Sequence, residues 1–174
     1  MTAKLKRGIT KVKDPGSALT HFIAMILAII AAIPLLSKAG HDSGHMRISA
    51  LAIFILSMIG LYAASTIYHT LDISPKINKL LRKIDHMMIF ILIAGTYTPV
   101  CMIVLGDKTG WTMLTLVWGI AIVGILINAL WITCPKWFSS LIYIAMGWVC
   151  ILAITKILSS MPRAGFMWLL AGGI

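Results

Sequence analysis

Charged residues are scarce in this sequence: they make up 11% of the 174 residues, whereas hydrophobic residues make up 60%. The charges are also unevenly spread, because long stretches contain no Lys, Arg, Asp or Glu. These uncharged runs are Ala18–Ser37, Ile48–His69, His86–Gly106, Thr109–Pro135 and Trp137–Thr155. A soluble domain of this length does not need so much apolar surface, so the composition excludes that class.

Each uncharged run has roughly the 20 residues that a helix needs to cross roughly 30 Å of hydrocarbon. Only helices and closed barrels satisfy their backbone in lipid, and the alternation typical of barrel strands is missing. The sequence therefore predicts an all-α membrane protein with a single integral membrane domain over residues 1–174. The expected spans are 18–37, 48–69, 85–105, 111–133, 137–156 and an incomplete sixth at 164–174.

The last apolar run is short for a membrane span. Its residues, 164–174, would reach only about half of the hydrocarbon thickness as a helix. We expect this run to belong to a longer span that continues past Ile174. The alternative is a re-entrant or interfacial end.

Several common functional signatures are absent from the sequence. Cys101, Cys134 and Cys150 have neither metal nor redox spacing, so no disulfide framework is expected. The sequence also contains no phosphate-binding loop, nucleophile elbow or internal repeat.

The net charge of +10 does not indicate nucleic acid as a partner. Basic residues cluster before the first span and in the loop expected over 70–83, whereas the 38–47 loop has only Lys38 and Arg47. This alternation is the positive-inside pattern, and it predicts a cytoplasmic N-terminus and a cytoplasmic 70–83 loop. Membrane lipids are the expected partners, because these basic residues can contact anionic headgroups. The sequence makes no prediction of oligomeric state.

Ser65, His69 and Asp85 are polar residues at the edges of two neighbouring apolar runs. Ser65 and His69 are four residues apart, so a helix places them on one face. With the N-terminus inside, Asp85 and His21 fall at the same cytoplasmic depth. Polar groups gathered at one depth in a bilayer are costly, and they indicate a functional site.

The chemistry of these residues fits a metal-dependent hydrolase. A neutral imidazole such as that of His69 is a good zinc ligand, and a nearby carboxylate can orient it or act as a general base. A serine hydroxyl can hydrogen-bond a substrate carbonyl. Asp85 and His86 are consecutive and diverge by about 100° on a helix, so both are not expected to face one ligand. A catalytic zinc usually has three protein ligands, and this sequence offers one convincing candidate.

Each of these residues also has a purely structural interpretation. His69 could be an interfacial histidine among headgroups, and Asp85 could cap the third helix. Ser65 could be a small packing residue between helices, and His21 could form a hydrogen bond with the backbone of a neighbouring helix. The common depth of all four residues favours the site over four separate structural roles.

The sequence resembles the hemolysin III family in a combination of short motifs. This family is the bacterial branch of the progestin and adipoQ receptor superfamily, which is also grouped with the alkaline ceramidases. The motifs are Ser17-Ala-Leu-Thr-His21, Ser65-x-x-x-His69, Asp85-His86 and Gly95-Thr-Tyr-Thr-Pro99. The resemblance covers nearly the whole chain.

The resemblance implies seven spans in a bacterial plasma membrane, with a zinc ion near the cytoplasmic face. It implies His69 as one zinc ligand, with two further histidines from a seventh span that would lie beyond Ile174. It places Ser65 and Asp85 beside the metal as catalytic residues, and His21 and His86 as possible supporting residues around it. Three candidate functions stay open: a zinc-dependent lipid amide hydrolase, to which Ser65, His69 and Asp85 point; a pore-forming cytolytic protein, which the family name implies; and a non-enzymatic regulator of membrane state.

Overall fold

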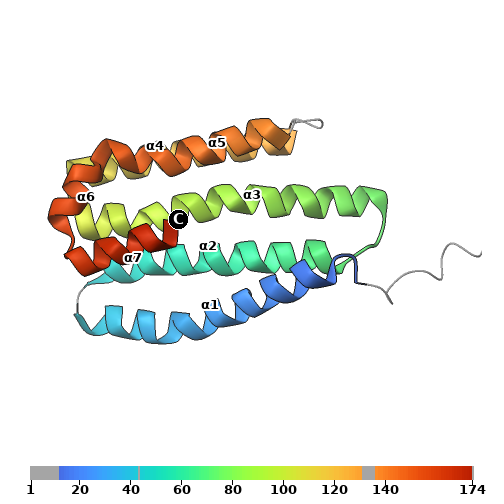
Figure 1. Cartoon of the computed structure of the whole chain (residues 1–174), viewed down its shortest axis with the longest axis horizontal. Helices are drawn as coiled ribbons and strands as arrows, with labels where there is room; N and C mark the ends of the chain where they lie inside the picture. The colour runs from blue at the N-terminus through green and yellow to red at the C-terminus, as the bar shows by residue number, and fades with distance from the viewer. Residues whose placement is uncertain (1–11, 43, 131–135, 174) are drawn as a thin grey trace, which may run out of the picture.

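The computed structural model describes residues 12–42, 44–130 and 136–173, and those residues form a bundle of long helices (Figure 1). The helices run back and forth along the long axis of the molecule. In chain order they are α1 (Pro15–Asp42), α2 (His45–Thr70), α3 (Pro75–Pro99), the π-helical segment η1 (Val100–Leu105), α4 (Lys108–Leu130), α5 (Lys136–Trp148), the 3-10 segment η2 (Val149–Ala153), α6 (Ile154–Ser160) and α7 (Arg163–Gly173).

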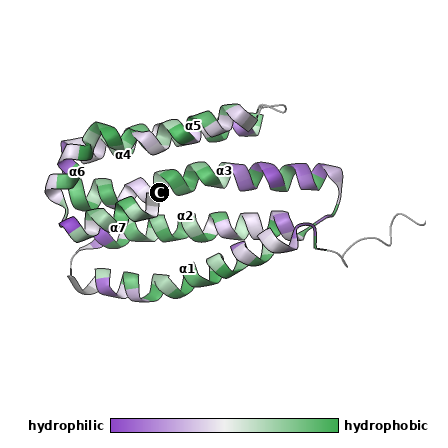
Figure 2. Cartoon of the chain, viewed as in Figure 1, coloured by the Kyte–Doolittle hydropathy of each residue, from purple (hydrophilic) through white to green (hydrophobic). Residues whose placement is uncertain are grey.

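Five helical stretches among the described residues are long and apolar enough to cross a membrane. They are Pro15–Gly40, His45–Thr70, Pro75–Leu105, Lys108–Leu130 and Trp137–Ser160. Figure 2 shows hydrophobic residues along the middle of the helices and hydrophilic residues near their ends. The prediction of an all-α membrane protein is therefore confirmed. The end of the expected fourth span (131–133), Cys134 and the basic residues before Lys13 lie outside the described residues.

The buried core lies where α3 and η1 meet α4 and the α5–η2–α6 stretch. Its members are apolar side chains, namely Phe90, Ala94, Tyr97, Cys101, Leu105, Met113, Val117, Ala121, Met146, Val149, Ala153 and Ile157. Glycine permits the closest approaches: a Cβ at Gly124 would lie 2.4 Å from Cε1 of Phe90, and one at Gly95 would lie 2.2 Å from Oγ of Ser57. Small residues at helix contacts are how membrane helices pack closely without a hydrophobic driving force.

α3 begins earlier than the sequence suggested. A loop was expected over 70–83, but α3 starts at Pro75 and the connection is only Leu71–Ser74. The physical reason is a strong helix start, because the Ser74 hydroxyl accepts a hydrogen bond from the N–H of Ile77 at 3.3 Å and proline occupies the first helical position. The basic residues of this stretch therefore lie on helical turns, which form the hydrophilic end of α3 in Figure 2.

Candidate functional site

The C-terminal end of α2 and the N-terminal end of α1 meet through histidine and serine side chains. Ser65 is 3% exposed, and its Oγ lies 2.6 Å from Nδ1 of His21. The His21 ring also packs edge-on against the rings of Tyr62 and His69, with centroids 5.9 Å and 5.7 Å apart. The interpretation of Ser65 as only a packing residue is therefore incomplete, because its hydroxyl is bonded to an imidazole from a different helix.

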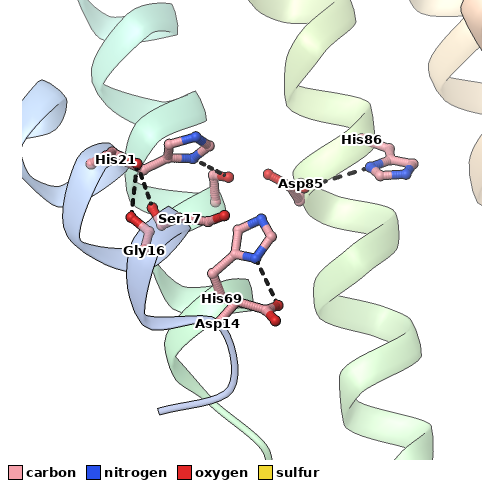
Figure 3. Close-up of polar contacts among 9 residues, drawn as sticks. Asp14, Gly16, Ser17, His21, His69, Asp85 and His86 are labelled. Carbon is pink, nitrogen blue, oxygen red and sulfur yellow. Dashed lines mark hydrogen bonds and ion pairs between the residues drawn. The ribbon is translucent and has the colours of Figure 1, made fainter.

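Asp85 approaches the same place from α3. Its side chain is buried, and it is close enough to interact with Ser65, His86 and His69. Since α3 begins at Pro75, Asp85 is ten residues inside the helix and cannot cap its N-terminus. The capping interpretation is therefore wrong, and another reason is needed for a carboxylate in this apolar bundle. Figure 3 shows the Asp85 carboxylate turned toward His21 and His69.

His69 has a partner that the sequence interpretation missed. Its Nδ1 lies 3.0 Å from Oδ2 of Asp14, a residue directly ahead of α1. The signal that could have identified Asp14 was available in the sequence, because this aspartate is the only acidic residue in a basic segment at the depth assigned to His69.

His86 does not join this cluster. Figure 3 shows it on the other side of α3 from His21 and His69, as the divergence of consecutive helical residues predicted. Its Nδ1 is 3.5 Å from Oδ2 of Asp85, and within the described residues that nitrogen has no hydrogen-bond partner. The backbone carbonyl of His86 accepts a hydrogen bond from the hydroxyl of Tyr143 at 2.8 Å.

Buried polar side chains occupy two separate spaces in the bundle. His21, Ser65, His69 and Asp85 lie together between α1, α2 and α3. Ser139 of α5 donates to Oδ1 of Asn128 on α4 at 3.0 Å, and this second contact ties α5 to α4. We name the first group, with Asp14, the α1–α3 polar cluster.

The α1–α3 polar cluster fits part of a zinc site. The carboxylate of Asp14 accepts a hydrogen bond from Nδ1–H of His69, which leaves Nε2 as a possible metal ligand. Asp85 offers a second potential donor on the facing helix. Among the described residues no three His, Cys, Asp or Glu side chains are grouped to hold a metal, so further ligands would have to come from elsewhere.

Long apolar helices with a buried polar cluster near one end define an integral membrane protein of the all-α class. Comparison with known proteins gives its family. The family described as haemolysin-III related matches residues 9–174, so the chain belongs to that family. This confirms the resemblance found in the sequence motifs.

Two relatives show the extent of the similarity. The chain is 39% identical to hemolysin-3 of Bacillus cereus over 175 aligned residues, which cover 100% of this chain and 80% of the relative. It is 36% identical to a hemolysin-3 homolog of Bacillus subtilis (strain 168) over 162 residues, which cover 93% of this chain and 76% of that protein.

Proposed function

We propose that this protein is a zinc-dependent hydrolase that cleaves an amide bond of a membrane lipid at the α1–α3 polar cluster. The observation that carries the proposal is the convergence of His69, Ser65 and the buried Asp85 from two neighbouring helices. Intramembrane carboxylates are rare because their burial is costly, and they usually mark a function. The family resemblance adds zinc and the precedent of lipid amide hydrolases.

The roles of the residues follow from their chemistry. His69 would hold the metal through Nε2, because its Nδ1 is already bonded to Asp14. A bound zinc ion supplies a Lewis acid that polarises a carbonyl group. Asp85 would take a proton from the attacking water as general base. Ser65 would hydrogen-bond the lipid carbonyl and, through Nδ1 of His21, keep its hydroxyl directed into the site.

The proposal also includes an orientation in a bacterial plasma membrane. The end of the bundle with the polar cluster carries Lys13 ahead of α1 and four basic residues on the first turns of α3: Lys76, Lys79, Arg82 and Lys83. By the positive-inside rule this end faces the cytoplasm. The substrate would then be a lipid whose amide reaches the cytoplasmic leaflet, beside helices whose outer surfaces are apolar.

The test measures zinc content and lipid cleavage with the purified full-length protein. We expect close to one zinc per chain, and release of a fatty acid from a fluorescent N-acylsphingosine in phosphatidylcholine vesicles. His69→Ala should lose both, whereas His45→Ala, at the other end of α2, should keep both. Asp85→Asn should keep zinc and lose cleavage, with Asp72→Asn as its control. Folded wild-type protein without metal would refute the proposal.

A second candidate function comes from the name of the relatives. The Bacillus cereus protein is named hemolysin-3, and this name implies cytolysis. A direct pore would release calcein from vesicles without cleaving lipid, and the Asp85→Asn variant would release it as fast as the wild type. That result would favour the pore. A third outcome, full cellular function in Asp85→Asn with misfolding of His69→Ala, would favour a regulator in which zinc is only structural.

A further inference from the structure

The segment directly ahead of α1 lies across the last turn of α2. The N–H of Asp14 donates to the carbonyl of His69 at 2.9 Å, and the N–H of Lys13 donates to the carbonyl of Thr70 at 3.4 Å. The last carbonyls of a helix have no partner inside the helix, so these bonds complete the end of α2. They also fix the backbone of Asp14 beside that of His69.

The side chains of the same two residues form a third bond. Nδ1 of His69 and Oδ2 of Asp14 are 3.0 Å apart. A carboxylate can only accept, so the proton must be on Nδ1 of the imidazole. In a neutral ring the lone pair is then on Nε2. Because backbone and side-chain bonds join the same pair of residues, both the position and the direction of the ring are determined.

The surroundings of the ring support a single orientation. The His69 ring packs edge-on against Tyr68, with centroids 4.8 Å apart, and against His21 at 5.7 Å. Lys13 places its ammonium group 3.6 Å from the centre of the Tyr68 ring, which fastens the same segment to α2. Figure 3 shows the second ring nitrogen of His69 turned to the side where Asp85 lies.

We infer that Asp14 is a positioning residue, which holds His69 in the Nδ1–H tautomer with Nε2 directed toward Asp85. A carboxylate on the far nitrogen of a ligating histidine fixes the tautomer and makes the metal-binding nitrogen more basic. The consequence for zinc rests on the proposed function, whereas the tautomer and the ring direction do not. Asp14 itself touches neither substrate nor metal.

The tautomer can be read directly by NMR on the full chain labelled with ¹⁵N-histidine in nanodiscs, at alkaline pH where exposed imidazoles are neutral. We expect His69 to carry its proton on Nδ1 in the wild type, because the carboxylate of Asp14 can only accept. Asp14→Ala should lose this preference. His45, at the opposite end of α2, is the reference in each spectrum.

Two results would overturn the inference: a wild-type His69 with its proton on Nε2 or on both nitrogens, or an Asp14→Ala variant with an unchanged tautomer. The first depends on the wild type alone, so the test does not require every variant to fold. Zinc binding is the separate arm, in which Asp14→Ala should bind about 10–100-fold more weakly and Asp72→Ala should not change. Absence of zinc from the wild type would refute the proposed function and leave the tautomer result standing.

Discussion

Removal of the Tyr97 hydroxyl should destabilise the junction between α5 and η2. Tyr97 is buried in α3, and its hydroxyl accepts a hydrogen bond from the N–H of Cys150 at 2.9 Å. The same oxygen is 2.9 Å from the carbonyl oxygens of Met146 and Gly147, to which it donates its single proton. The hydroxyl thus bonds backbone groups at the point where the α-helix gives way to a 3-10 segment.

The size of the effect follows from these bonds. Tyr97→Phe keeps the ring and removes one accepted bond and one donated bond. Hydrogen bonds between membrane helices average about 0.6 kcal/mol, with a maximum near 1.7, and a buried group left without a partner costs about 1–3 kcal/mol. We therefore expect the free energy of unfolding to fall by about 1–3 kcal/mol. If the N–H of Cys150 finds a backbone acceptor within its own helix once the hydroxyl is removed, the loss of stability should lie at the lower end of this range.

The assay is equilibrium unfolding in mixed micelles, followed by circular dichroism. Tyr68→Phe is the matched control, because the Tyr68 ring is only partly buried and its contact with the Lys13 ammonium involves the ring face, which phenylalanine keeps. If Tyr97→Phe were as stable as wild type and the control, the backbone at the junction would not depend on the hydroxyl, and the reasoning would be refuted.

Two further predictions concern the end of the bundle that lies opposite the α1–α3 polar cluster. A Cβ at Gly110 would lie 2.3 Å from the backbone oxygen of Cys101, which cannot rotate away, so Gly110→Ala should lower the free energy of unfolding by about 1–3 kcal/mol, whereas Gly119→Ala has open space and should not. Lys156 and the N–H of Gly110 lower the pKa of Asp107 below its ordinary value of 3.8. The Asp107 carboxylate therefore stabilises the fold above pH 3.8, and this contribution is lost as the pH falls through the pKa of the folded state. The free energy of unfolding should fall less steeply with decreasing pH in Asp107→Asn than in the wild type. An equal slope in the two proteins would contradict the lowered pKa of Asp107.

The sequence predicted the class of fold well because apolar run length is a direct consequence of bilayer thickness. The sequence was less informative about helix boundaries that lie outside the apolar runs. Charged residues at 76–83 looked like a loop, yet Ser74 and Pro75 begin α3 there, and this changed the interpretation of Asp85 from a cap to a residue deep inside a helix.

The candidate site was predictable in its depth but not in its partners. Counting residues from the ends of the spans placed His21, Ser65, His69 and Asp85 at one level. It could not tell which side of each helix faced which neighbour, since that depends on packing, as at the close approach of Gly95 to Ser57. The Asp14–His69 pair was missed because His69 lies at the end of α2 whereas Asp14 lies outside the spans, in the segment ahead of α1.

The bonds from residues 13 and 14 to the last turn of α2 also bear on the order in which the protein assembles. Asp14 leaves the ribosome well before His69 is made, so these bonds can form only after α1 and α2 have both inserted and paired in opposite directions. The α1–α2 hairpin is thus the smallest unit of the chain that can hold His69 in place.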